Sequence, residues 1–311
     1  MTARPFRFGV SIQTAATRAE WSEKARRAES FGFDTVLVAD HLVDNMLSPF
    51  TALLAAADAT ERLRVGTLVL NNDFRHPALV AREAAVVDLL SDGRFELGLG
   101  AGHMKFEYDE VGLQFDPPSV RVERMTESAE VIRRLLDGET VTFDERHYHL
   151  TEHRCFPVPA RHVPLLIGGN GRRVLTAAAR LADIVGFTGF SQVEGNTAGQ
   201  VNPTHFTEAG LRQQIDWVLA AAPERFDGIE LSTLVQGITI TDDRRAAAED
   251  VQPLLPMLTV DDILSSPYSL IGTYEEIATQ LRDRRDQLGI SYLTVFEKDL
   301  EPMARLIELL S

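Results

Sequence analysis

The chain has 311 residues, of which 44% are hydrophobic and 25% are charged, so it can bury one large core. Its formal net charge of -15 repels nucleic-acid phosphates and anionic membrane surfaces, so neither is expected as a partner. No apolar stretch approaches the roughly 20 residues that span a bilayer, and no signal-peptide pattern opens the chain.

Short apolar runs alternate with longer amphipathic stretches, which is the pattern of parallel strands joined by crossover helices. Strands are predicted at Phe6–Ile12, Thr35–Ala39, Arg64–Leu70, Phe95–Gly100, Pro164–Gly168, Ile184–Thr188, Ile229–Ile240 and Tyr292–Phe296. Helices are predicted at Glu20–Phe31, Phe50–Thr60, Ala78–Leu90, Val120–Leu136, Arg172–Leu181, Thr207–Ala221, Tyr274–Leu288 and Leu300–Leu310. Thr273 and Glu276 have the spacing of a capping box. The order predicts an α/β fold, a (β/α)8 TIM barrel formed by one domain over residues 1–311.

Three segments exceed ordinary loop length and predict insertions after the fourth, sixth and seventh strands. Val141–His162 alternates like a hairpin and is expected to pack outside the barrel. Phe190–Phe206 follows the sixth strand, at the face where TIM barrels carry their active sites, and is a candidate lid. Arg244–Ile271 extends the connection after the seventh strand.

The Asp40-His41 pair directly follows the predicted second strand, at the end where side chains of a TIM barrel face the ligand. A histidine can donate or accept a proton near neutral pH, and a neighbouring carboxylate can orient it. His41 and Asp40 are therefore candidate catalytic residues. The alternative is a plain turn aspartate beside a solvated histidine, and position alone leaves both open.

Two glycine-rich segments also follow predicted strands. The segment from Gly98 to Gly102 lacks the third glycine of a dinucleotide fingerprint, which would fall at His103, but its bare backbone lets a flat ligand approach. The segment from Gly168 to Arg173 opens a helix, so its free N–H groups and the helix dipole can hold a phosphate. Tight turns without a ligand are the alternative for both segments.

No metal site is expected. His147, His149, His153 and Cys155 are zinc-ligand types, but their spacing matches no standard site. As the only cysteine, Cys155 cannot form an intramolecular disulfide, which favours a reducing, cytoplasmic location and a buried thiol. The motifs G-x-S-x-G and H-E-x-x-H and the Lys-Ser/Thr of a P-loop are missing, so hydrolase readings lack support.

Four segments together resemble the luciferase-like monooxygenase superfamily, in particular its F420-dependent branch. They are Asp40-His41, Asn71–Pro77, Leu90–Gly100 and Pro164–Gly171. The most specific is Leu90–Gly100, with Leu-Ser-Asp-Gly-Arg-Phe before a glycine-rich strand end. The resemblance covers nearly the whole chain and implies a redox enzyme that binds coenzyme F420, or alternatively FMN, at the mouth of the barrel.

The resemblance also implies roles for single residues. His41 would stand beside the reactive centre of the ring and serve in proton transfer, with Asp40 next to it. A non-proline cis peptide supporting the ring would fall at Asn71-Asn72, and Arg75 would lie near the ring or substrate. The cofactor would be bound by Asn71, Asn72, Phe74, Gly100, Ala101, Gly102, His103, Gly168, Gly169, Asn170, Gly171 and Arg172.

Three functions follow from this resemblance. The preferred one is an F420-dependent oxidoreductase that passes a hydride between the deazaflavin C5 and a small-molecule substrate while His41 handles the proton. The second is an FMN-dependent monooxygenase, because a flavin, unlike a deazaflavin, activates oxygen well. The third is a non-catalytic flavin-binding barrel, since fold does not determine function. Likeness to dimeric relatives also implies a homodimer.

Overall fold

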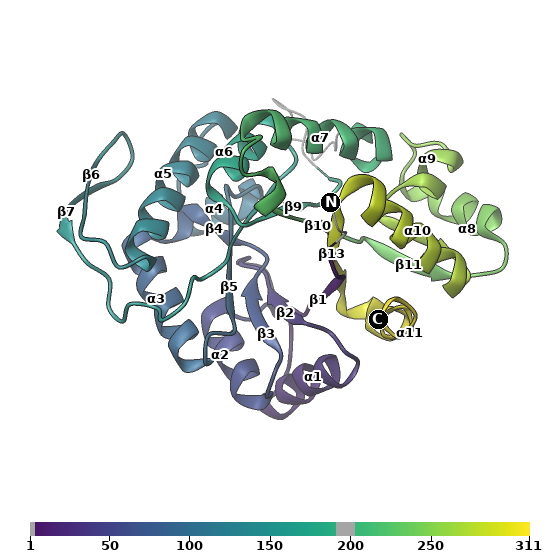
Figure 1. Cartoon of the computed structure of the whole chain (residues 1–311), viewed down its shortest axis with the longest axis horizontal. Coiled ribbons are helices and arrows are strands. Elements are labelled where there is room, and N and C mark those ends of the chain that lie inside the picture. Colours follow the sequence, from purple (N-terminus) through teal and green to yellow (C-terminus); the bar gives the residue numbers. More distant parts are fainter. Residues whose placement is uncertain (1–3, 191–202) are drawn as a thin grey trace.

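The computed structural model describes residues 4–190 and 203–311. Its main sheet is parallel and closes into a barrel, because β3 (Arg64–Thr67) pairs both with β2 and with β5 (Figure 1). The other barrel strands are β1 (Arg7–Ser11), β2 (Thr35–Val38), β5 (Phe95–Gly100), β8 (Leu165–Gly168), β9 (Ile184–Phe187), β10 (Glu230–Leu234) and β13 (Ile290–Phe296). The short β4 (Leu70–Asn71) resumes the line of β3 and also pairs with β5. The predicted TIM barrel is confirmed.

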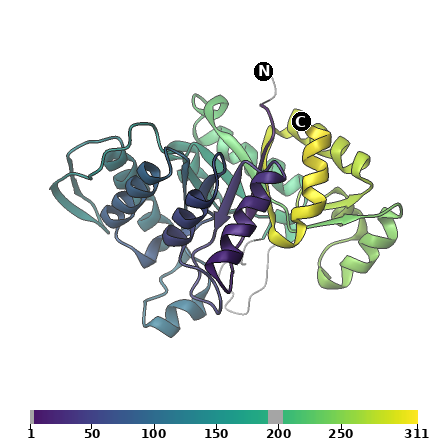
Figure 2. The same ribbon diagram turned by 90° about the horizontal axis from the view of Figure 1, so that it is seen from below.

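The helices surround the barrel, and their apolar faces pack on the outer side of the strands (Figure 1). They are α1 (Arg18–Ser30), α2 (Pro49–Ala59), α3 (Pro77–Leu90), α5 (Pro118–Leu136), α6 (Arg172–Leu181), α7 (Glu208–Ala221), α10 (Tyr274–Leu288) and α11 (Leu300–Leu310). The capping box predicted at Thr273 and Glu276 opens α10, with both reciprocal hydrogen bonds present. Figure 2 shows α1 and α11 side by side, where Arg27 forms an ion pair with Glu301.

The barrel interior has an apolar middle and a charged base. Leu37, Leu166, Ile184 and Tyr292 form a separate buried cluster inside the strands. At the amino ends of the strands, Arg7 and Arg64 both bind the buried Glu96, and Arg7 also binds Glu230. Burial raises the pKa of Glu230, an effect that Arg7 opposes. A pocket at this base is lined by Arg7, Arg64 and Glu96, whereas ligands of TIM barrels bind at the opposite, carboxyl end of the strands.

The predicted seventh strand, Ile229–Ile240, is wrong as a single element. β10 ends at Leu234, and β11 (Gly237–Ile240) leaves the barrel to pair with β12 (Ser269–Gly272) in a separate two-stranded sheet. The change of partner occurs at Gln236, whose N–H donates to the Tyr268 carbonyl, whereas the N–H of Val235 still donates to Thr294 of β13. The connection between β11 and β12 contains α8 (Arg244–Val251) and α9 (Val260–Ser265).

The two other predicted insertions have different outcomes. Val141–His162 contains the antiparallel hairpin β6 (Val141–Asp144) and β7 (His149–His153), which lies outside the barrel against α5 (Figure 1). The predicted lid, Phe190–Phe206, lies mostly in residues 191–202, outside the described residues. Cys155 is buried as expected, and burial raises the pKa of its thiol. Within the described ranges, no helix is long and apolar enough to cross a bilayer.

Candidate active site

The imidazole of His41 is bonded to a carboxylate from a distant part of the chain. His41 lies just beyond β2, and its Nδ1 is 3.1 Å from Oε1 of Glu107, whose side chain is 1% exposed. The same oxygen accepts the main-chain N–H of Leu42 at 2.7 Å. Since Glu107 occupies Nδ1, Nε2 is the nitrogen left to exchange a proton with a ligand.

Glu107 belongs to α4 (Lys105–Val111), a short helix absent from the predicted elements. An ion pair between Lys105 and Asp109, one turn apart, supports the helix, and Gly112 ends it in the left-handed conformation. Tyr108 holds it to the barrel, since its buried hydroxyl is 2.9 Å from Oδ1 of Asn71. Gly112 was the available sequence signal for this helix end.

Asp40 does not orient His41, contrary to the expectation from the sequence. Its carboxylate is bound by both terminal nitrogens of Arg75, one of them at 3.2 Å, and it accepts the main-chain N–H of Asn71 at 3.1 Å. The Asp40 side chain is 4% exposed. Asp40 therefore ties the end of β2 to the segment after β4, and Glu107 takes the role expected of Asp40.

The cis peptide lies at Leu68-Val69, and the predicted location at Asn71-Asn72 is wrong. This bond falls between β3 and β4, where the strand is interrupted before pairing resumes at Leu70. Both side chains are only partly buried above the apolar cluster inside the barrel. The cis bond thus precedes the asparagines because the interruption itself comes earlier in the strand.

Glycines on neighbouring strands make room for Val69. A Cβ on Gly100 would lie 2.6 Å from Cγ2 of Val69, and a Cβ on Gly168 would lie 3.3 Å from Cγ1. A Cβ on Gly98 would also come close, at 3.2 Å from Cγ1. The sequence predicted that these glycines let a ligand approach the backbone. They also leave room for Leu68 and Val69, which form an apolar surface at the mouth, called here the apolar floor.

The predicted asparagines are held within the protein. Asn71 Oδ1 accepts from Tyr108 and from the main-chain N–H of Asp73, and Asn72 Nδ2 donates to the Tyr148 hydroxyl at 3.2 Å. Phe74 packs against the Tyr108 ring with the centroids 5.5 Å apart. These residues hold the loops around the site through contacts within the protein and offer a ligand little side-chain surface.

The segment from Ala101 to His103 lies against His41. Gly102 has a φ of +73°, and a Cβ there would lie 2.6 Å from Asn71 Oδ1. Arg121 donates to the carbonyl oxygens of Ala101 and Gly102. The His103 ring meets that of His41 edge to face at 5.4 Å. His103 is exposed at the surface, but protein atoms around its ring displace water. This desolvation lowers the pKa of His103, and the nearby His41 lowers it further by charge repulsion.

The β8–α6 turn presents the first N–H groups of α6. Gly171 is its N-cap and offers no side-chain cap, while Arg172 is exposed. Gly169 has its N–H bonded to the Gly186 carbonyl at 3.0 Å. Asn170 is buried and bonded on both sides, its Oδ1 accepting the Thr188 N–H at 3.1 Å. The geometry suits an anion at the helix end, with Asn170 positioning the turn.

A group of metal-ligand types occurs away from the mouth. Glu123, Glu127 and His147 have ligand atoms within 4.8 Å of one another. Glu123 already pairs with Arg146 at 3.0 Å, and Glu127 accepts the main-chain N–H of His147 at 2.9 Å. In the part of the chain that the structure describes, His149, His153 and Cys155 do not join this group.

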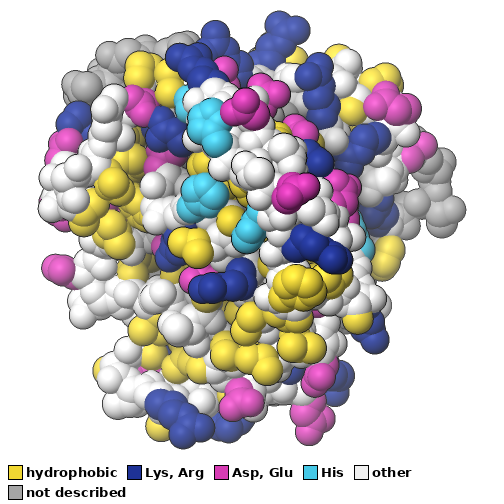
Figure 3. Space-filling model, turned by 90° about the vertical axis from the view of Figure 1, so that its left-hand side faces the viewer, with side chains coloured by type: hydrophobic (Ala, Val, Ile, Leu, Met, Phe, Trp, Pro, Cys, Tyr) yellow, Lys and Arg dark blue, Asp and Glu magenta, His cyan; other side chains and the backbone are white. Residues whose placement is uncertain are grey.

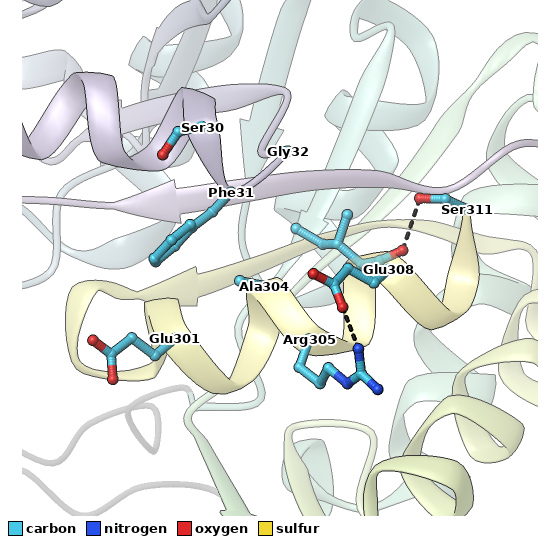
Figure 4. Close-up of a pocket in the computed structure, with 9 residues that line it drawn as sticks. Ser30, Phe31, Gly32, Glu301, Ala304, Arg305, Glu308 and Ser311 are labelled. Carbon is cyan, nitrogen blue, oxygen red and sulfur yellow. Dashed lines mark hydrogen bonds and ion pairs between the residues drawn. The ribbon is translucent and has the colours of Figure 1, made fainter.

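A surface groove of about 680 Å³ lies between the end of α1 and α11 (Figure 4). Phe31 and Ile307 are among its lining residues, and its Arg305 and Glu308 pair with each other. None of the residues predicted for the site lines it. This groove is therefore separate from the carboxyl ends of the barrel strands.

Comparison with known proteins identifies the family. The profile described as "Luciferase-like monooxygenase" matches residues 1–258. This chain belongs to the luciferase-like monooxygenase family. The family resemblance inferred from Asp40-His41 and the glycine-rich segments is thus confirmed.

Several curated relatives are named as F420-dependent enzymes. The F420-dependent glucose-6-phosphate dehydrogenase of Nakamurella multipartita is 32% identical over 261 residues, covering 81% of this chain and 73% of that protein. The enzyme of the same name from Microbacterium testaceum is 28% identical over 91% of this chain and 82% of its own. The 5,10-methylenetetrahydromethanopterin reductase of Archaeoglobus fulgidus is 29% identical over 57% of this chain and 51% of its own.

Two solved structures share this fold over nearly the whole length of this chain. An F420-dependent secondary alcohol dehydrogenase, in complex with an F420-acetone adduct, has a TM-score of 0.77 at 21% identity, covering 99% of this chain and 98% of its own. The coenzyme F420 dependent tetrahydromethanopterin reductase from Methanopyrus kandleri has a TM-score of 0.76 at 18% identity, covering 99% of this chain and 100% of its own. At these identities the likeness establishes the shared fold.

Proposed function

We propose that this chain is an F420-dependent oxidoreductase that transfers a hydride between coenzyme F420 and a small organic substrate. The observation that carries the proposal is the His41–Glu107 pair, which stands at the mouth of a luciferase-like barrel. The names of two curated relatives, both F420-dependent glucose-6-phosphate dehydrogenases, support the choice of cofactor.

The residues at the mouth fit a planar ring with an anionic tail. Leu68 and Val69 offer a partly exposed apolar floor, and the glycines at positions 100 and 168 carry no side chain that would cover it. The uncapped end of α6, with Arg172 beside it, supplies N–H donors and positive charge for a phosphate. We assign contact with the cofactor to Gly100, Ala101, Gly102, His103, Gly168, Gly169, Gly171 and Arg172.

Bound F420 supplies the site with a hydride donor or acceptor at one carbon of its ring. The chain's own part is to move the accompanying proton. Because Glu107 holds the Nδ1 side of His41, the imidazole is kept in one orientation, and Nε2 can take or give a proton on the ligand side. In this proposal His41 is the catalytic residue and Glu107, Asp40, Asn71, Asn72, Phe74 and Asn170 are positioning residues.

A titration of the purified protein with F420 and with FMN tests the cofactor directly. We expect F420 to bind at micromolar or lower concentration, FMN to bind at least about tenfold more weakly, and the reduced complex to consume little oxygen. Tight FMN binding with rapid oxygen consumption by the reduced protein would replace this function with an FMN-dependent monooxygenase. Failure to bind either compound would remove the redox function.

We also propose that the protein forms a homodimer. Exposed hydrophobic side chains occur on α3 and after β7, including Leu79, Leu89, Leu90 and Phe156. Figure 3, a view of the side that carries the hairpin, shows hydrophobic side chains gathered over part of this face. Light scattering would show twice the chain mass if the proposal is right, and the monomer mass if it is wrong. A cytoplasmic location stays a prediction.

A further inference from the structure

We infer that the substrate of this chain is an organic molecule without a phosphate group. The inference rests on the proposed function, since it takes the end of α6 as the site of the cofactor's phosphate. A phosphate loses hydration when it binds, so a site that holds one needs unpaired cationic or N–H donors. The basic residues around the mouth therefore restrict the charge of the substrate.

Most basic side chains on the loops after the barrel strands are engaged within the protein. The ion pairs are Arg75 with Asp40, Lys105 with Asp109, Arg245 with Asp261 and Lys298 with Asp299. Arg121 and Arg244 instead donate to main-chain carbonyl oxygens. Each ion pair has no net charge, so it adds little positive field for a phosphate at the mouth.

Three arginines near the mouth have no such partner among the described residues. Arg172 and Arg173 open α6, where the cofactor's phosphate is proposed to bind. Arg18 is the first residue of α1 and is exposed. A single exposed arginine gives a phosphate little stabilisation, because water screens the charge.

The charges beside Arg18 cancel one another. Lys24 bonds to both Glu20, at 3.1 Å, and Glu297, at 2.9 Å, and Lys298 is paired with Asp299. Three cations and three carboxylates therefore lie on this side of the mouth. Their sum provides no positive field for a dianion.

The sequence of residues 191–202 and the histidines at positions 103 and 205 add no positive charge at neutral pH. Residues 191–202 contain neither Lys nor Arg, so their sequence supplies no cation whatever their placement. Burial lowers the pKa of His205, and desolvation lowers that of His103, so both are neutral at pH 7. Next to His41 and Glu107 in the chain, Leu42 and Phe106 are 45% and 49% exposed. This apolar surface suits a substrate without a strongly hydrated phosphate group.

The test compares glucose 6-phosphate with glucose on the full-length protein saturated with F420. Cofactor fluorescence reports both F420 binding and F420 reduction, and thermal unfolding reports substrate binding without turnover. At about 10 mM, glucose 6-phosphate should raise the Tm by no more than glucose does and should not reduce F420. A saturable rise in Tm specific to the phosphate, or turnover of glucose 6-phosphate, would overturn the inference.

A variant with Arg172→Ala and Arg173→Ala separates this result from failure of the proposed function. If F420 does not bind the unaltered protein, the proposed function fails, and glucose 6-phosphate is then tested on the cofactor-free protein. If the double variant no longer binds glucose 6-phosphate, the phosphate binds at α6, and this result supports a single phosphate site. Binding that survives in the double variant reveals a second phosphate site and contradicts the inference. Arg18→Ala serves as the matched control and should change neither F420 binding nor the Tm with glucose 6-phosphate.

Discussion

His41 and Glu107 are 66 positions apart in the chain, yet Nδ1 of the imidazole lies 3.1 Å from Oε1 of the buried carboxylate. The histidine comes from the carboxyl end of β2 and the glutamate from α4, which follows β5. This contact joins two loops at the mouth of the barrel. It explains how one histidine can keep a defined orientation while its other nitrogen faces a ligand.

Replacing His41 with Ala should lower kcat by about 100- to 10,000-fold, because the substrate loses its proton-transfer partner. F420 affinity, measured by fluorescence titration, should change by no more than about threefold. His149→Ala, on the exposed hairpin, is the control and should keep full activity. Unchanged turnover in the His41 variant would remove this residue from the mechanism.

Glu107→Gln should lower kcat by about 10- to 100-fold while KM and F420 affinity stay near their original values. A glutamine oxygen can still accept the Leu42 N–H, but it does not provide the negative charge beside His41. Asp109→Asn, on the exposed side of the same helix, is the matched control. An equal loss of kcat in both variants would point to a disturbed helix rather than to a positioning role.

Arg75→Ala should lower the free energy of unfolding by about 3 kcal/mol, because it leaves the buried Asp40 carboxylate without its cation. Urea unfolding measures the change. The exposed pair of Arg134 and Glu139 provides the comparison, and Arg134→Ala should cost at most about 1 kcal/mol. Similar losses in the two variants would mean that Asp40 is stabilised mainly by the Asn71 N–H.

Gly102→Ala should destabilise the protein by about 2 kcal/mol or more. The positive φ strains any residue with a Cβ, and the added atom would collide with the Tyr108 hydroxyl and Asn71. Gly228→Ala is the control, since a Cβ there meets nothing within 4 Å, and its effect should stay within about 0.5 kcal/mol. Equal denaturation midpoints for the two variants would contradict the packing described around Tyr108.

Unfolding should become easier as the pH falls from about 7.5 to 5.5, because His205 has a lowered pKa in the folded protein. The unfolded chain takes up the proton first, near pH 6.5, so the contribution of this histidine is complete above that pH and is lost below it. His205→Gln should reduce the pH dependence of the urea midpoint, whereas His149→Gln, at an exposed position, should not. An unchanged dependence in the His205 variant would exclude this group as its source.

The barrel and the loops that form its mouth could be predicted from the amino-acid pattern alone. Apolar runs and amphipathic stretches have their own periods, and parallel strands joined by helices place every strand end on one face. His41, the Gly98–Gly102 segment and the Gly168–Arg173 segment could therefore be assigned to the same mouth without coordinates. The exit of β11 from the barrel had no such signal, because its residues continue the apolar pattern of β10.

Which side chains meet at that mouth could be seen only in the folded protein. Asp40 is adjacent to His41 in sequence, but the β2 end directs its carboxylate to Arg75, while α4 brings Glu107 to the imidazole. The position of α4 depends on Tyr108 bonding to Asn71, a contact between loops after different strands. Local periodicity places strand ends on a common face, but contacts across that face depend on loop paths and packing, which no short-range pattern specifies.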